Sequence, residues 1–179
     1  IFAFDALLDP SIPLVSLVGI AGTGKTLLSV AAGLKMILES KFYKKMLVSK
    51  PVIPMGKDIG YLPGSIEDKM KPWLQPVYDN LEFLSSLKGK KIDEYLSKKD
   101  IIEVEVLSYI RGRSIPNQYI IIDEAQNLTP HEIKTIITRA GEGTKIVLTG
   151  DPFQIDNPYL DNSSNGLVYV ASKFKGSPL

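Results

Sequence analysis

The chain has 179 residues, of which 44% are hydrophobic and 23% charged, as in a folded globular domain rather than a disordered or fibrous protein. It has no cysteine and one histidine, which excludes disulfides and thiol-based metal sites and argues against a zinc cluster. The net charge is +1, so overall charge does not indicate nucleic-acid binding, and with no membrane span or signal peptide visible we expect a cytoplasmic protein.

Hydrophobic periodicity predicts alternating helices and strands in the first half of the chain. The expected elements are a helix at 2–8, a strand at 14–18, a helix at 25–40, a strand at 45–49 and a helix from 65 to 86. Pro72 is expected to interrupt the last helix, in which Trp73, Tyr78 and Phe83 recur at helical spacing and are expected in the core. The proline- and glycine-rich stretch 51–64 is typical of a functional loop.

The second half continues the alternation. The expected elements are strands at 101–106, 119–123 and 145–149, and a helix from 129 to about 139. Residues 129–132 (TPHE) form a capping box with proline at the first helical position. The strand at 119–123 is almost wholly apolar, as in a sheet covered on both faces. We therefore predict an α/β fold with a mainly parallel sheet of about five strands and helices on both faces.

Residues 19–26 read GIAGTGKT, a full match to the phosphate-binding loop between a strand and a helix. Gly22 and Gly24 allow the backbone amides to surround an anion, and the following helix adds its positive amino end. Lys25 can reach the β- and γ-phosphates, and Thr26 can offer its hydroxyl to Mg²⁺. A tight turn with a surface lysine is the alternative. The residues expected to bind the nucleotide are Gly19, Ala21, Gly22, Thr23, Gly24, Lys25, Thr26 and Leu27.

Two adjacent acids follow the most apolar strand, where ligands bind in open α/β sheets. We expect Asp123 to hold Mg²⁺ opposite Thr26, and Glu124 to act as the general base on the attacking water. Gln154, after the strand at 145–149, can contact the γ-phosphate and report its loss. Two solvated acids and an ordinary Gly-Asp-Pro turn are the alternatives.

Several basic residues are candidates for phosphate contacts. Arg139, Arg111 or Arg113 could stabilise the transition-state charge of phosphoryl transfer, from the same chain or from a neighbour, although structural salt bridges are as compatible with the pattern. Lys50 and Lys57, with the two arginines that flank Gly112, could bind RNA or lie on a solvated surface. The guanine-binding sequence N-K-x-D is absent from the chain, which favours an adenine nucleotide.

Five segments together resemble the PhoH family of P-loop ATPases over nearly the whole chain. They read GIAGTGKT, SKPVIPMGKDIGYLPG, YIRGRSIPN, YIIIDEAQNLT and TRAGEGTKIVLTGDPFQID. The opening LLDPSIPLVSLVG is similar to the branch in which this domain follows an amino-terminal PIN ribonuclease domain. We therefore expect residues 1–179 to be one ATPase domain from a longer protein.

The resemblance implies a RecA-like core that binds ATP and Mg²⁺. By motif, Lys25 and Thr26 would bind phosphate and metal, Asp123 and Glu124 would serve metal binding and hydrolysis, and Gln154 would be the γ-phosphate sensor. The family is also associated with hexameric rings and with RNA unwinding.

We therefore predict a Mg²⁺-dependent ATPase that remodels RNA as a homo-oligomer. A single core has no second domain to close over the nucleotide, so a neighbouring copy would supply the arginine. Two other functions use the same loop: a small-molecule kinase, which would transfer the phosphate to a metabolite, and a non-hydrolysing nucleotide switch, which would regulate an attached domain. The adjacent acids at 123 and 124 favour water activation over transfer.

Overall fold

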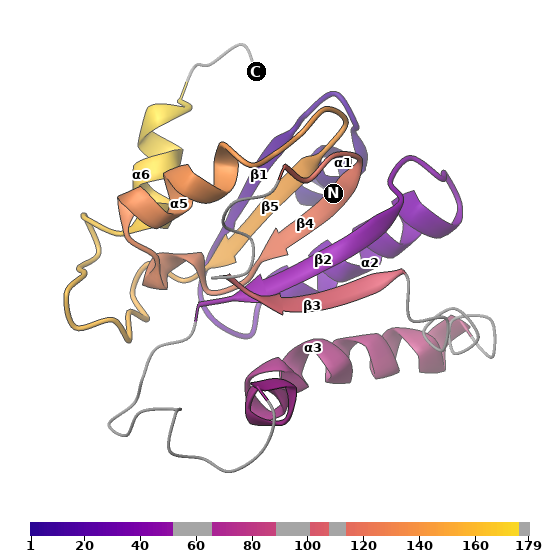
Figure 1. Cartoon of the computed structure of the whole chain (residues 1–179), viewed down its shortest axis with the longest axis horizontal. Helices are drawn as coiled ribbons and strands as arrows, with labels where there is room; N and C mark the ends of the chain where they lie inside the picture. The colour runs from indigo at the N-terminus through magenta and orange to yellow at the C-terminus, as the bar shows by residue number, and fades with distance from the viewer. Residues whose placement is uncertain (52–65, 89–100, 108–113, 176–179) are drawn as a thin grey trace.

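The computed structural model describes residues 1–51, 66–88, 101–107 and 114–175, with the backbone alone for 66–74, 87–88 and 105–106. The helices are α1 (Phe2–Leu8), α2 (Lys25–Leu38), α3 (Ile66–Lys88), α5 (Pro130–Ile137) and α6 (Gly166–Lys173), with a 3₁₀ turn η3 (Ala125–Asn127). The strands are β1 (Leu14–Val18), β2 (Lys45–Lys50), β3 (Ile102–Val106), β4 (Gln118–Ile122) and β5 (Lys145–Gly150). Figure 1 shows the strands side by side in one twisted sheet.

All five strands are parallel, in the order β1-β5-β4-β2-β3. The strand before the glycine loop is therefore separated from the strand before the acidic pair by β5. The register places Val18 beside Gly150 and Ser49 beside Ile122, so the carboxyl ends of four strands meet at one edge of the sheet. The α/β fold with a parallel five-stranded sheet that we predicted is confirmed.

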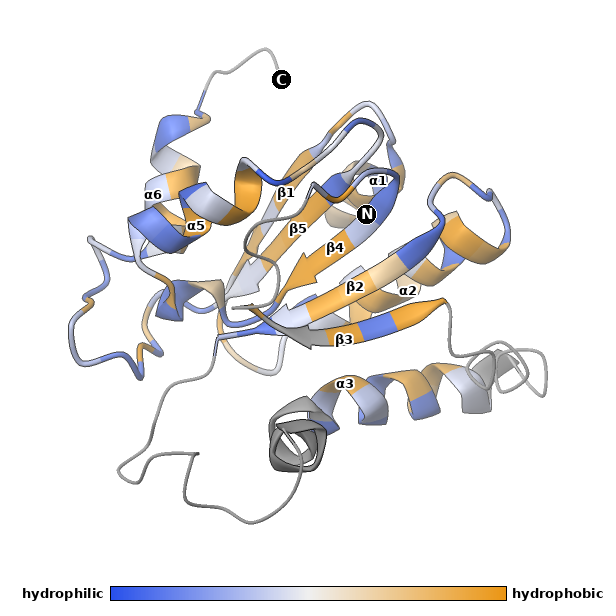
Figure 2. Cartoon of the chain, in the orientation of Figure 1, coloured by the Kyte–Doolittle hydropathy of each residue, from blue (hydrophilic) through white to orange (hydrophobic). Residues whose placement is uncertain are grey.

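Both faces of the sheet are covered, because alternate residues of each central strand point to opposite sides. In β4, Tyr119 and Ile121 pack with α1, α2 and α3, whereas Ile120 and Ile122 pack with α5 and α6. All four side chains are at most 1% exposed. Figure 2 shows the resulting apolar run along the central strands. This double burial explains why β4 is a continuous apolar run in the sequence.

The helices differ in two places from those predicted. Pro72 does not interrupt the helix, since α3 continues through this residue from Ile66 to Lys88. A proline inside a helix removes one hydrogen bond, and neighbouring turns can carry the helix past it. The second difference is α6, a helix that we did not predict. Its amino end is capped by Asn165, whose side chain accepts a hydrogen bond from the amide of Val168 at 3.0 Å.

The aromatic residues of α3 do not form the core contact that we expected. Tyr78 is 46% exposed and Phe83 is 51% exposed, whereas Val77 and Leu81 are buried against the sheet. Trp73 lies where only the backbone is described. Among the described side chains of α3, the buried apolar ones are therefore aliphatic and lie one or two positions before Tyr78 and Phe83, because helix rotation is set by the partner surface.

A buried lysine ties α1 to the amino end of the sheet. Lys145, the first residue of β5, is completely buried, and its ammonium group donates to the carbonyl oxygens of Ala6 (2.8 Å), Asp9 (2.7 Å) and Ile12 (2.8 Å). These three acceptors replace the water that the charge loses on folding. Burial nevertheless lowers the pKa of Lys145 to about 8, because desolvation disfavours the charged form.

This lowered pKa predicts a rise of stability with pH. Below pH 8 the ammonium is protonated in both the folded and unfolded states, whereas between pH 8 and about 10.5 only the unfolded chain retains the proton. The contribution of Lys145 to the free energy of unfolding should therefore rise by about 1.4 kcal/mol per pH unit across that window. Urea unfolding of the wild type and Lys145→Met at pH 7 to 10 should show the difference growing in favour of the wild type. For Lys44→Met, at an exposed position, the difference in the free energy of unfolding from the wild type should not change with pH. A difference that does not change with pH for Lys145→Met would contradict the prediction.

Candidate functional site

The glycine loop between β1 and α2 has the backbone geometry of an anion cradle. Gly22 has a φ of +75° and Gly24 a φ of +80°, a left-handed conformation that other residues adopt at a cost. A Cβ atom added at either position would meet nothing within 4 Å, so the glycines serve the backbone conformation and leave the space beside the loop open. Gly24 is also the residue that caps α2, which places the positive end of the helix at the loop.

Lys25 and Thr26, the first two residues of α2, point toward the loop and toward β4 respectively. The Lys25 ammonium donates to the carbonyl oxygens of Gly19 (2.8 Å) and Ile20 (2.9 Å), which keeps the charge at the loop. The Thr26 hydroxyl donates to Asp123 Oδ1 at 2.9 Å, across 97 residues of sequence. This contact joins the glycine loop to the acidic pair.

Asp123 provides the oxygen donors that a hard divalent cation prefers. It follows β4 directly, is 8% exposed, and accepts hydrogen bonds on Oδ1 from the hydroxyls of Thr26 (2.9 Å) and Thr149 (2.5 Å). A carboxylate and a threonine hydroxyl at hydrogen-bond distance, beside an open phosphate cradle, suit Mg²⁺. The arrangement supports the metal ligands expected from the sequence.

Glu124 is held in an uncommon conformation beside Asp123. Its φ of +54° lies in the left-handed region, which non-glycine residues seldom occupy outside turns and active sites. Its two carboxylate oxygens face different partners: Oε1 lies 3.8 Å from the Lys50 ammonium and Oε2 accepts from Gln126 Nε2 at 2.5 Å. The side chain is 34% exposed, so it remains open to water.

These groups line one pocket of about 400 Å³ at the carboxyl edge of the sheet. The predicted residues that line it are Ala21, Gly22, Gly24, Lys25, Thr26, Leu27, Asp123, Glu124 and Gln154. Two further segments contribute to the lining: the end of β5, with Gly150 and Asp151, and α3, with Pro76 and Asn80. The pocket brings together the ends of β1, β4 and β5, as expected for a ligand site in an open parallel sheet.

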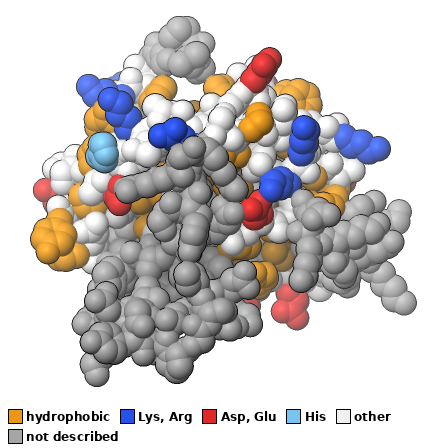
Figure 3. Space-filling view, in the orientation of Figure 1, with side chains coloured by type: hydrophobic (Ala, Val, Ile, Leu, Met, Phe, Trp, Pro, Cys, Tyr) orange, Lys and Arg blue, Asp and Glu red, His pale blue; other side chains and the backbone are white. Residues whose placement is uncertain are grey.

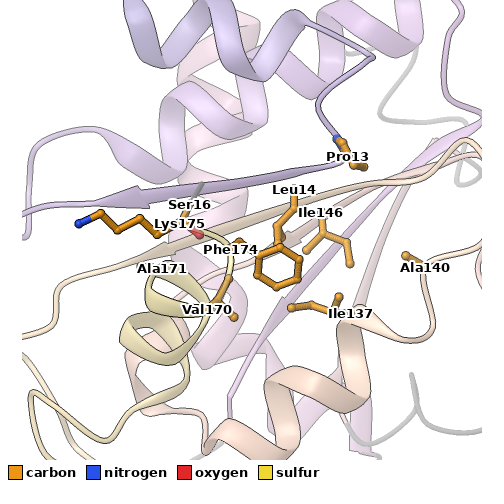
Figure 4. A pocket seen from close by; sticks show the side chains of 10 residues that line it. All are labelled: Pro13, Leu14, Ser16, Ile137, Ala140, Ile146, Val170, Ala171, Phe174 and Lys175. Atoms are coloured by element: carbon orange, nitrogen blue, oxygen red, sulfur yellow. The ribbon is translucent and has the colours of Figure 1, made fainter. Parts of the chain in front are cut away.

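A second hollow, of about 330 Å³, lies on the opposite side of the sheet from α2, between β1, β5, α5 and α6 (Figure 4). Its lining is apolar apart from Ser16 and Lys175, and the close-up shows Leu14, Ile146 and Phe174 lying close together along it. It holds no acidic side chain, so the first pocket is the candidate site.

The predicted basic residues are not gathered at the pocket. Arg139 follows α5, and its carbonyl oxygen accepts from the amide of Ile115, which places it near the amino ends of the strands. It therefore does not reach the phosphate loop of its own chain, and of the two alternatives for Arg139 only the site of a neighbouring copy remains. Lys50 ends β2, and its ammonium lies 3.8 Å from Glu124 Oε1, next to the pocket. Lys57, Arg111 and Arg113 lie outside the described residues.

Sequence reasoning missed two residues that organise the site. Asp151 is buried, and its carboxylate accepts from the loop amide of Ala21 at 3.0 Å. Gln126 is completely buried and bonds to Glu124, Asp151 and Gln154. A glutamine three positions after Asp123 indicates a role in the site only once the turn after β4 is known to fold back toward β5.

The chain matches the family model of the PhoH-like protein over residues 3–178. It belongs to that family. It is 60% identical over 178 residues to Protein PhoH2 of Bacillus subtilis (strain 168) and 44% identical over 178 residues to Protein PhoH2 of Mycolicibacterium smegmatis, in each case covering 99% of this chain and 40% of the relative. A PhoH-like protein of Bacillus subtilis (strain 168) is 39% identical over 159 residues, which are 89% of this chain and 48% of that protein.

The chain thus spans less than half the length of these relatives. Membership places it among P-loop nucleotide-binding domains, in agreement with the geometry of the glycine loop. Among the described helices, none is long and apolar enough to cross a lipid bilayer.

Proposed function

We propose that this PhoH-like domain hydrolyses ATP with Mg²⁺ and uses the energy to remodel RNA as part of a homo-oligomer. The observation that carries the hydrolytic part is the convergence of Lys25, Thr26, Asp123 and Glu124 on one pocket, brought from two strand ends. Together these side chains would bind the phosphates, hold the metal ion and activate the water, which are the requirements of phosphoanhydride hydrolysis.

The loop amides and the Lys25 ammonium would bind the phosphates and orient them. Thr26 and Asp123 would hold Mg²⁺, which neutralises negative charge on the β- and γ-phosphates when bound. Glu124 would take a proton from the attacking water, because one side of its carboxylate is held by Gln126 and the side chain is still open to solvent. Gln154 also lines the pocket, and its side chain would contact the γ-phosphate.

An oligomer would supply an arginine that the described part of the pocket lacks. No arginine lines the pocket among the described residues, and Arg139 lies at the far end of the sheet. A neighbouring copy would therefore provide the arginine that stabilises the transition-state charge. Lysines near the β2 end favour RNA as the polyanion, although the described Lys and Arg side chains are spread over the face seen in Figure 3 rather than gathered in one patch.

Phosphate release from ATP, measured with and without Mg²⁺ and single-stranded RNA over a salt series, tests the proposal. We expect Mg²⁺-dependent release in the absence of any acceptor, preference for ATP over GTP, and stimulation by RNA that declines with salt. Tight ATP binding with no release, even with RNA, would support a nucleotide switch instead. Phosphate transfer only in the presence of a metabolite would support a kinase. Mass measurement that finds full activity in a monomer would contradict the proposed neighbouring arginine.

A further inference from the structure

Gln126 occupies the centre of a buried hydrogen-bond network. It lies in η3, three residues after Asp123, and is completely buried. Its Nε2 donates to Glu124 Oε2 at 2.5 Å and to the carbonyl oxygen of Gln154 at 2.9 Å, while its Oε1 accepts from the amide of Asp151 at 3.2 Å. Both donors of the amide group are therefore used, and they connect two segments that follow different strands.

The absence of a side chain at Gly150 leaves room for the amide group of Gln126. A Cβ atom added at Gly150, the last residue of β5, would lie only 2.3 Å from Gln126 Oε1. Gly150 has an ordinary β-strand conformation, so close approach of the glutamine, rather than a left-handed backbone, explains the glycine there. The left-handed φ of Glu124 turns the chain so that its carboxylate meets the same amide group.

The network continues from Gln126 to the phosphate loop. Asp151 donates its amide to Gln126 and accepts, on Oδ2, from the loop amide of Ala21 at 3.0 Å. Its other oxygen, Oδ1, accepts from the amide of Phe153 at 3.0 Å, which shapes the turn that leads to Gln154. One hydrogen-bonded path, with Gln126 and Asp151 buried at its centre, thus joins the loop, the turn after β5 and the Glu124 carboxylate.

We propose that Gln126 is a positioning residue that aims the Glu124 carboxylate and couples it to the position of the Gln154 main chain. The inference rests on the proposed ATP hydrolysis. Because one amide group bonds to both partners, a shift of the 151–154 turn when the γ-phosphate binds or leaves changes where Glu124 is held. A side chain needed only to fill this space would be apolar, since a buried amide must have its hydrogen bonds satisfied.

Gln126→Met tests this role, because methionine has a similar length and removes all three hydrogen bonds. Gln118→Met is the matched control, since it makes the same chemical change at the first residue of β4, at the end of that strand away from the pocket. We expect Gln126→Met to lower kcat by about 10- to 100-fold, the loss typical of a misplaced catalytic group, with KM and the Kd for ATP within about twofold of wild type. We expect Gln118→Met to leave all three unchanged.

Hydrogen exchange supplies a readout that does not need turnover. A non-hydrolysable ATP analogue with Mg²⁺ should protect both 150–157 and 124–128 in the wild type, whereas in Gln126→Met the protection at 124–128 should be lost and that at 150–157 kept. Unchanged kcat, or unchanged protection at 124–128, would overturn the proposal. Loss of ATP binding and of cooperative unfolding together with kcat would overturn it too, by showing a structural role. If the wild type shows the coupled protection but releases no phosphate, the proposed hydrolysis fails while the coupling stands.

Discussion

Glu124→Gln is expected to lower ATP turnover by about 10²- to 10⁴-fold, the usual contribution of a general base. Glutamine keeps the size of the side chain and an oxygen that can still accept from Gln126 Nε2, so the turn after β4 should keep its conformation. It cannot accept a proton from water, and it removes the charge that faces Lys50. The loss should therefore fall on kcat, while the affinity for ATP stays within about twofold.

Single-turnover phosphate release and equilibrium nucleotide binding measure the two effects separately. Glu142→Gln makes the same chemical change at an exposed position in the turn before β5, and should behave as wild type. Wild-type turnover by Glu124→Gln would remove Glu124 from the proposed role. A large loss of ATP affinity in the same variant would instead indicate that Glu124 serves binding.

Lys25→Ala is expected to weaken ATP binding by about 10- to 100-fold, because hydrogen bonds to a charged group contribute roughly 1.5–3 kcal/mol each. Turnover should fall further, since the ammonium also faces the charge that develops on the transferred phosphate. The only described partners of Lys25 Nζ are the Gly19 and Ile20 carbonyls, which lie at the loop surface. We therefore expect little change in the free energy of unfolding.

Lys35→Ala is the matched control for this substitution. Lys35 lies on the same helix, α2, and is half exposed, where it pairs with Glu39 at 3.6 Å. An exposed pair of this kind contributes about 0.3–0.5 kcal/mol to stability and nothing to the pocket. Equal ATP binding by Lys25→Ala and Lys35→Ala would contradict the proposed role of the loop lysine.

Much of the fold is visible in the sequence because its signals are local. The capping box that we predicted at the start of α5 is present in the structure. Thr129 Oγ1 accepts from the Glu132 amide at 3.2 Å, and the Glu132 carboxylate accepts from the Thr129 amide at 2.9 Å. The apolar runs of β4 and β5 are recognisable as strands because residues that are buried on both faces of a sheet are mostly apolar. The helix boundaries at α1 and the start of α2 follow from the same short-range rules.

Short-range sequence signals also explain which site residues could be predicted from the sequence. Residues 19–26 and the pair at 123 and 124 each carry their chemistry in a few consecutive positions, next to an apolar strand. Parallel strands bring their carboxyl ends to one edge, so the two groups were expected to meet. The Thr26 to Asp123 contact at 2.9 Å confirms that meeting.

What the sequence by itself determined is therefore the nucleotide-binding loop, the acidic pair, the parallel sheet and the family. Tertiary structure alone decided the contacts between distant segments: Asp151 with Ala21, 130 residues apart, Gln126 with the turn after β5, and the buried ammonium of Lys145 at α1. It also decided that Arg139 lies at the wrong end of the sheet for its own pocket. The physical reason is that a motif depends on neighbours in the chain, whereas strand order and helix rotation decide which polar groups meet in space and must satisfy one another there.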